Sequence, residues 1–174
     1  ETHSLPELLV RYGVNDWLEL RFATNYEVGG AGNPVSANSP DDLAEEAELE
    51  EEANVSYGLK LALLAQNGWT PRSALILQGA TPTAGVATDT HFHATYVTGW
   101  TLQDGWTWDS SIRVGTGSLE DDRFQVWAPS SVVKFPLSER WKGHVEYFGV
   151  FSEGRARETT QHFFSPGAHV MLTE

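Results

Sequence analysis

The chain has 174 residues, which suits one domain, and it contains no cysteine, which excludes disulfides, a thiolate nucleophile and a thiolate metal site. Its formal net charge of -13 argues against nucleic acid as a partner, because a phosphate backbone needs a basic binding face. No apolar run approaches the roughly 18 residues of a transmembrane helix. Hydropathy alone therefore favours a soluble acidic protein, but the strand pattern of the chain argues against that interpretation.

Short β-strands are predicted along nearly the whole chain. Apolar and polar residues alternate within segments of mostly about ten residues, a length typical of a tilted strand that crosses a bilayer. Turn residues such as Asn-Gly and Asp-Gly separate the segments. The predicted strands span residues 8–12, 17–26, 55–64, 73–80, 92–101, 106–115, 124–135, 142–152 and 163–172.

An acidic block interrupts this pattern between the second and third segments. Ser39 and Pro40 ahead of the block resemble a helix start, so a solvated helix or a disordered stretch is the simplest interpretation. Calcium binding is the alternative, but the spacing does not match an EF-hand loop. We treat residues 27–54 as a loop insertion in a single domain of residues 1–174. The carboxylates of the block are Asp41, Asp42, Glu45, Glu46, Glu48, Glu50, Glu51 and Glu52.

The connections between the predicted strands alternate in length. Residues 13–16, 65–70, 103–105 and 138–141 form tight connections, whereas residues 27–54, 81–90, 116–122 and 153–161 form longer ones. If successive strands are antiparallel neighbours, the tight turns lie at one end of the sheet and the long loops at the other. Outer-membrane barrels show this asymmetry.

The two faces of the predicted strands differ in character. In residues 55–64 the odd positions are apolar, whereas the even positions are mostly small or charged. Any half-buried strand alternates in this way, but small and ionisable partners suit the wall of a lumen, and only closed barrels cross lipid as β-structure. Pro129 predicts a bulge or kink in residues 124–135. The candidate lumen or selectivity residues are Arg11, Glu19, Arg21, Lys60, Asp109, Arg113, His144 and Glu146.

Tryptophan gathers near the tight turns, and other aromatic residues lie near the long loops. Two such rows are expected where aromatic rings meet lipid headgroups, although they could also cap the core of a sandwich. Trp17 does not fit this arrangement well. It shares the polar face of its strand with Glu19, whereas the apolar face is formed by the alternate positions. Phe124, Phe151 and Phe163 are expected in the row near the long loops. The main candidate membrane-interface residues are Trp69, Trp100, Trp106, Trp108, Trp141, Tyr26, Tyr57 and Phe92.

Several short motifs follow one another in order along most of the chain. They are Leu-Pro-Glu-Leu-Leu-Val-Arg-Tyr-Gly at residues 5–13 with Asp16 and Glu19-Leu20-Arg21, then Tyr57-Gly58-Leu59-Lys60, Pro82-Thr83-Ala84-Gly85 and Val145-Glu146-Tyr147-Phe148-Gly149. Together they resemble the outer-membrane proteins grouped as the meta-pathway of phenol degradation family. The resemblance implies a β-barrel of Gram-negative outer membranes that is linked to uptake of hydrophobic or aromatic compounds.

Two features depart from the family pattern. Ala84 interrupts the usual Pro-Thr-Gly, and the sequence ends at Leu172-Thr173-Glu174 rather than at Phe or Trp. With about nine strands and this ending, the chain is expected to be a fragment of a larger barrel.

No catalytic arrangement is predicted. The sequence has neither a Walker motif nor a nucleophile elbow, and Gly115-Thr116-Gly117 lacks the context of a dinucleotide loop. His91 and His93 share a face and could hold a metal with a carboxylate, but two histidines near a loop rim are more often solvated. Hydrolysis by an acid–base pair lacks a recognisable nucleophile or pocket. We expect no enzyme, no cofactor and no metal.

Taken together, the sequence predicts an all-β, antiparallel, up-and-down transmembrane β-barrel. Its expected role is a channel or transporter for small hydrophobic or aromatic molecules, with outer-membrane lipid and a small-molecule solute as partners. Charge pairs on the inner wall (Glu19 with Arg21, Asp109 with Arg113, His144 with Glu146) would brace the interior or select a solute. The acidic block would repel anions or attract cations at the mouth.

Two alternatives stay open. One is a soluble β-sandwich or barrel that binds sugars or apolar ligands through exposed tryptophan. The other is a structural outer-membrane barrel with a filled interior and no transport.

Overall fold

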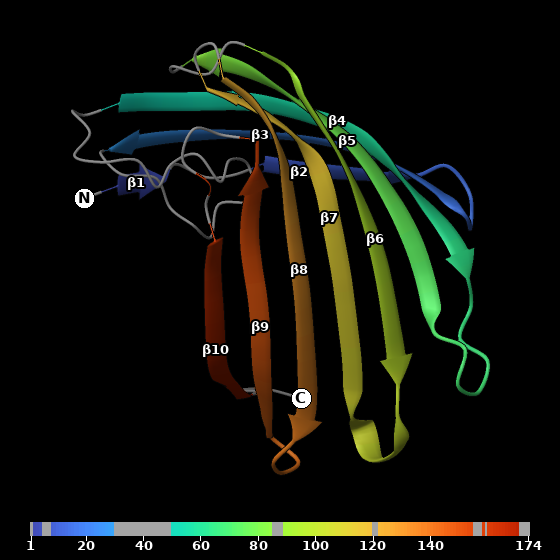
Figure 1. Ribbon diagram of the computed structural model, residues 1–174. Helices are drawn as coiled ribbons and strands as arrows, with labels where there is room; N and C mark the ends of the chain where they lie inside the picture. The colour runs from blue at the N-terminus through green and yellow to red at the C-terminus, as the bar shows by residue number, and fades with distance from the viewer. Residues whose placement is uncertain are drawn as a thin grey trace.

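The computed structural model describes residues 2–4, 8–29, 50–84, 89–119, 122–154, 158 and 160–170, and every structural statement below concerns these residues (Figure 1). The described chain is all-β apart from one 3-10 turn, η2 (Gln103–Gly105). The strands are β1 (Thr2–Ser4), β2 (Leu8–Gly13), β3 (Leu18–Gly29), β4 (Glu50–Leu64), β5 (Arg72–Ala84), β6 (His91–Thr101), β7 (Thr107–Leu119), β8 (Asp122–Pro136), β9 (Trp141–Glu153) and β10 (Thr160–Val170).

All described strands belong to one antiparallel sheet, in which the strands from β2 to β10 pair in sequence order. β1 and β2 both pair with β3, β1 against its residues 27–29 and β2 against its residues 19–24, so they share one edge position. The all-β, antiparallel, up-and-down fold expected from the sequence is confirmed. Each of the nine predicted segments corresponds to a strand, and the sequence analysis missed only the short β1.

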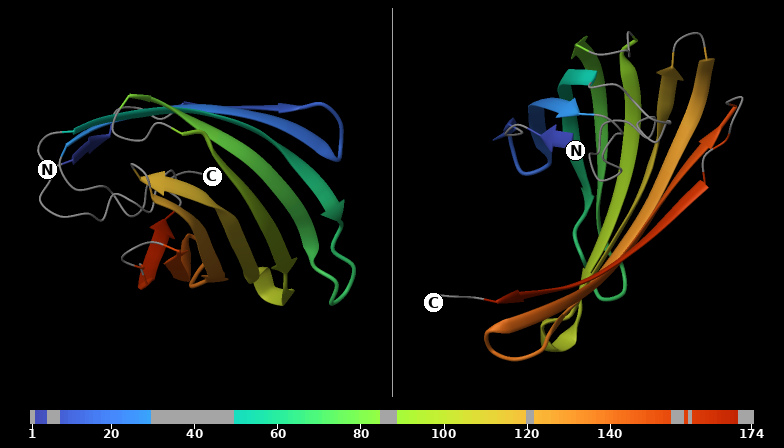
Figure 2. Two further views of the ribbon diagram at one scale, coloured as in Figure 1. Left: turned by 45° about the horizontal axis from the view of Figure 1, so that its top comes forward. Right: turned by 90° about the vertical axis from the view of Figure 1, so that its left-hand side faces the viewer.

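The sheet is strongly curved but not closed. In the left view of Figure 2 it forms an arc that runs from β1–β3 at the top, through the middle strands, to β10 at the lower left. Among the described strand pairings, none joins β10 to β1 or β2, so the expected closure into a barrel is not seen. The described residues contain no helix that is long and apolar enough to span a membrane.

Tight turns form where the sequence predicts them, because local side chains and glycines satisfy the backbone. The Asn15 side-chain oxygen accepts hydrogen bonds from the backbone N–H groups of Trp17 (3.0 Å) and Leu18 (2.9 Å). Gly68 and Gly105 adopt positive φ angles of 58° and 77°, which glycine tolerates without a steric penalty. These turns join successive antiparallel strands, so they all lie at one end of the sheet.

β8 continues through Pro129 without a shift of register, so of the predicted bulge or kink the bulge is wrong. Its register with β7 is continuous from Leu119↔Asp122 to Thr107↔Lys134. On the other side, the pairing with β9 lapses between Trp127 and Ser130 and resumes without a shift. This local gap accommodates the missing proline N–H. The register shifts of the sheet lie between β4 and β5 instead, at residues 53–54 and 62–64.

The acidic insertion is shorter than residues 27–54, since β3 continues to Gly29 and β4 begins at Glu50. The remainder of the acidic block, with its expected helix, lies outside the described residues.

Neither face of the sheet is covered by a second layer in the described structure. Its extensive packing contacts join strands that are adjacent in the sheet, or η2 with β8. The only buried apolar residues described are Ala74, Ala80 and Phe124. A soluble domain of this size buries a sizeable hydrophobic core between two layers. The stability of this sheet therefore depends on what lies against its faces.

Candidate functional site

The strand register places all eight candidate lumen residues on one face of the sheet. Residues directly opposite each other on neighbouring strands share a face. Glu19 lies opposite Lys60, and Thr95 lies opposite Arg113. We call the face that holds these residues the inner face and the opposite face the outer face. The eight candidates on the inner face are Arg11, Glu19, Arg21, Lys60, Asp109, Arg113, His144 and Glu146.

The inner face is the concave side of the curved sheet. Most of the described buried residues lie on it, including Ser56 (4% exposed) and Thr95 (8% exposed), although no layer covers them. Side chains on the inside of a curve converge and shield one another, whereas those on the outside spread apart. The polar side chains are therefore the ones that the curvature encloses.

One ionic cluster lies at the β2–β4 end of the inner face. Arg11 donates to Glu19 through both Nε (to Oε1, 3.0 Å) and Nη2 (to Oε2, 2.8 Å), so the pair is bidentate. Arg21 Nε lies 3.7 Å from Glu19 Oε1, and Lys60 lies directly opposite Glu19 on β4. Three cations thus surround one carboxylate. The predicted pairing of Glu19 with Arg21 is present, and Arg11 is a closer partner.

A second ion pair spans three strands. Arg72 Nη2 of β5 donates to Asp109 Oδ1 of β7 at 2.8 Å, across Gly99 of β6, which lies opposite both residues. A Cβ atom at Gly99 would collide with the Asp109 carboxylate and would lie 2.8 Å from Arg72 Nε. Asp109 therefore pairs with a residue two strands away that the sequence analysis did not single out. One feature of the sequence could have identified Arg72. It lies one residue before the predicted strand 73–80, at a position that alternation along this strand assigns to the inner face.

The inner face of β8–β10 is more apolar. Phe148 and Phe163 stack with ring centroids 4.5 Å apart, and Phe124 is only 4% exposed. The predicted pairing of His144 with Glu146 is not among the ion pairs of the described residues; His144 stacks on His169 instead (4.9 Å). Phe124 and Phe163 lie near the long-loop end as predicted, but the register places them on the inner face, so they do not belong to an outward-facing aromatic row.

The outer face is apolar and exposed over most of its area. Ile112 is 43% exposed and Val145 51%, with no protein layer over either. Among the described side chains of the strands, the only Lys, Arg, Asp or Glu on this face are Arg123 and Glu153, both at the long-loop end. An apolar exposed area that continues over so many strands indicates an interaction surface.

Aromatic residues border the outer face at the tight-turn end. Trp100 stacks on Trp108 (4.9 Å), and Trp106 stacks on Phe135 (5.1 Å). The indole N–H of Trp100 donates to the Trp69 carbonyl (3.0 Å), and that of Trp108 donates to Ser131 Oγ (2.9 Å). Trp141 lies on the same face, opposite Val170. Nearer the long loops, the outer face bears Tyr26, Tyr57, Phe92, Trp127 and Phe151.

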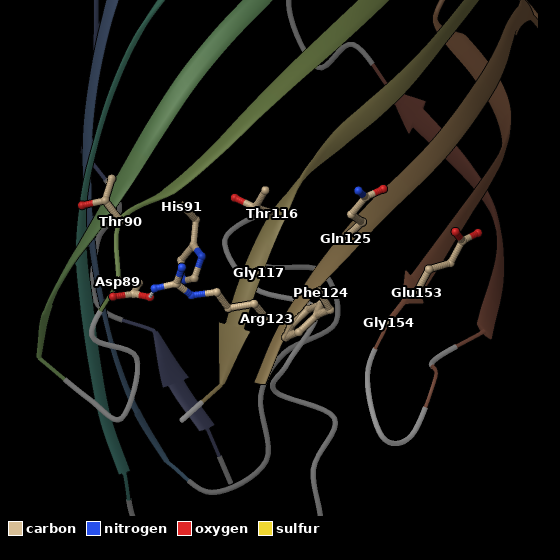
Figure 3. A pocket seen from close by; sticks show the side chains of 10 residues that line it. All are labelled: Asp89, Thr90, His91, Thr116, Gly117, Arg123, Phe124, Gln125, Glu153 and Gly154. Atoms are coloured by element: carbon tan, nitrogen blue, oxygen red, sulfur yellow. Dashed lines mark ion pairs between the residues drawn. The ribbon is translucent and has the colours of Figure 1, made fainter. Parts of the chain in front are cut away.

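One open cavity lies at the long-loop end of the sheet, and a groove lies on the outer face. At the long-loop end, Asp89, Thr90, His91, Thr116, Gly117, Arg123, Phe124, Gln125, Glu153 and Gly154 line an open cavity of about 810 Å³ (Figure 3). Across it, Arg123 Nη2 lies 3.5 Å from Asp89 Oδ2. His91 and His93 share the inner face as predicted, but the described residues contain no cluster of three or more metal-ligating side chains of His, Asp or Glu.

On the outer face, a groove of about 640 Å³ runs over Gly79 between Tyr57 and Phe92. Leu77, Ala94 and Val114 also line it. A Cβ atom at Gly79 would lie 2.9 Å from the Tyr57 ring and 3.1 Å from the Phe92 ring, so glycine is what keeps this groove open.

No family model matches the sequence, and a search of curated proteins gave no match. The resemblance to the phenol-degradation family stays a prediction.

Proposed function

We propose that this protein is a β-barrel of the outer membrane that lets small hydrophobic or aromatic molecules pass along its inner face. The observation that supports this most strongly is the contrast between the two faces. The outer face is apolar and uncovered, whereas the concave face bears the ionisable side chains. In water the outer face would need a partner layer, but hydrocarbon lipid supplies one.

The borders of the outer face fit the dimensions of a bilayer. The stacked tryptophans at the tight-turn end and the aromatic residues near the long loops lie at the two ends of strands of 11 to 15 residues. Transmembrane strands need about 9 to 11 residues, with aromatic girdles at both interfaces. The groove over Gly79 offers an apolar surface to an acyl chain.

The proposed barrel has its edges paired, because an unpaired edge in lipid leaves backbone groups without hydrogen bonds. The sheet alternates in direction from β2 to β10, which occupy its first and last positions, so these two strands run the same way. A direct seam between them would be parallel, and additional strands would allow an antiparallel seam instead.

Reconstitution into a planar lipid bilayer tests the proposal. We expect stepwise conductance increases together with heat-modifiable migration on a gel, since a folded barrel resists detergent until it is boiled. Protein that stays soluble without detergent and does not insert would contradict the proposal in favour of a soluble binding module. Heat-modifiable protein without conductance or solute flux would indicate a purely structural barrel.

A further inference from the structure

Two asparagine side chains on the inner face have amide oxygens without hydrogen-bond partners. Asn25 of β3 lies directly opposite Asn54 of β4, toward the long-loop ends of both strands. Asn25 is 8% exposed, and the Oδ1 atoms of both residues are buried with no partner. Among the described residues, no other two side chains with such atoms lie directly opposite each other. Because a buried oxygen without a partner is costly, the pair favours a ligand that presents positive charge or donors.

The neighbouring side chains on this face do not satisfy the two amide oxygens. The next inner-face pair toward the tight turns is Ala23 with Ser56. Pro82 of β5 lies opposite Asn54 on its other side, and neither alanine nor proline has a side-chain donor. Ser56 has one hydroxyl, but neither oxygen accepts a hydrogen bond from it. Both oxygens therefore stay available to a bound species.

Glutamate occupies the next inner-face position toward the long loops on both strands. The backbone register pairs Glu27 of β3 with Glu52 of β4, two residues along the strands from Asn25 and Asn54. Residues two apart on a strand share a face and are separated by about 7 Å. The register therefore brings two amide residues and two carboxylate residues together at four adjacent positions.

The surrounding charge favours a cation at this point. The nearest Lys or Arg on the two strands is Arg21, four residues from Asn25, which corresponds to roughly 13 Å along the strand. Interactions between charges in water fade beyond a Debye length of about 10 Å. Arg21 also has a carboxylate beside it, since its Nε lies 3.7 Å from Glu19 Oε1. Glu50 and Glu51 add to the negative charge on the long-loop side.

We propose that the two asparagines and the two glutamates form a calcium site at the long-loop end of the inner face. Calcium takes about six to eight oxygen ligands, including Asn carbonyls and carboxylates, and tolerates irregular geometry. Four side chains and water would complete such a shell. The site differs from an EF-hand loop because its ligands come from two paired strands. A bound ion would join β3 to β4 where the chain leaves them for the acidic insertion.

Isothermal titration calorimetry on the full chain in detergent micelles tests this site. After treatment with a chelator and dialysis, calcium chloride should bind at one site with a dissociation constant of about 0.1–1 mM, the range of extracellular calcium modules. Potassium chloride at about 0.15 M screens diffuse attraction to the acidic sequence. Magnesium should bind roughly tenfold more weakly or worse, since it requires a near-ideal octahedron. The titration does not require conductance, so its result is independent of the proposed transport.

Matched variants separate coordination from diffuse attraction. Glu52→Gln should weaken calcium binding by about tenfold or more. Glu51→Gln removes the same charge from the adjacent residue, which lies opposite Val28 at an outer-face position, so the affinity should stay nearly unchanged. Asn25→Ala should also lose about tenfold. Asn25→Asp keeps an oxygen ligand and adds a negative charge, so it should bind at least as tightly as the parent chain. Far-UV circular dichroism shows whether each variant keeps its β-structure.

The outcomes decide the proposal. Saturable binding that Glu52→Gln and Asn25→Ala weaken, and that Glu51→Gln preserves, would support it. Absence of saturable binding up to about 10 mM calcium, tenfold above the expected range, would overturn it. Equal losses in Glu51→Gln and Glu52→Gln, or full affinity in Asn25→Ala, would also overturn it, because the acidic sequence would then attract calcium without coordination by the strand pair.

Discussion

Replacing Ile112 with arginine is expected to destabilise the folded protein in lipid by about 2–4 kcal/mol, the penalty for a cation on the lipid-facing side of a barrel near the midplane. Ile112 lies on the outer face of β7, opposite Tyr96 and Pro129, and it is 43% exposed. It is four residues from Trp108 at the tight-turn border. Denaturant unfolding in lipid vesicles, followed by tryptophan fluorescence, gives the change in free energy.

Ser111→Arg is the matched control, because it adds the same charge one residue away on the inner face. Ser111 lies between Asp109 and Arg113 on that face and hydrogen-bonds Ser130 at 2.9 Å. We expect a loss well below that of Ile112→Arg. If the two variants lose equal stability, or if Ile112→Arg behaves like a neutral surface substitution, the outer face does not contact lipid.

Trp108→Ala is expected to cost about 2–4 kcal/mol of unfolding free energy in lipid, toward the lower part of the range for large aromatic residues because Trp108 is 42% exposed. The substitution removes the stack on Trp100 and the hydrogen bond from Nε1 to Ser131. It also removes an aromatic ring from the proposed headgroup level. The same vesicle unfolding assay measures the loss.

Trp69→Ala provides the comparison. The Trp69 side chain is 90% exposed, and only its backbone carbonyl accepts the Trp100 hydrogen bond, which alanine preserves. Its loss should stay below about 1 kcal/mol, as for other exposed positions. A larger loss for Trp69→Ala than for Trp108→Ala would show that the stacked row does not anchor the sheet.

Much of the fold could be predicted from local sequence, because each strand and each tight turn depends on neighbouring residues. Alternation with period two located the strands, and it also assigned the inner-face side chains, since parity along a strand fixes the face. The Asn15 turn shows the same principle, as its side chain bonds two backbone groups within three residues.

Features that depend on distant residues could not be predicted. The Arg72–Asp109 pair requires the register of three strands and a glycine between them. Pro129 produces no bulge because the β8–β9 pairing lapses there, which only the partner strand reveals. Closure of the sheet depends on how its two edges meet. None of these features leaves a pattern among residues that are neighbours in the sequence.

The most direct test of the central claim is a scan of single cysteines placed in turn at each position from residue 108 to residue 114. The chain has no native cysteine, so a spin label at each position reports without background. In lipid vesicles, labels at even positions should be accessible to oxygen and shielded from a water-soluble nickel reagent, because they face hydrocarbon. Labels at odd positions should show the opposite. Even positions that are open to the nickel reagent, or closed to both reagents as in a protein core, would contradict the account.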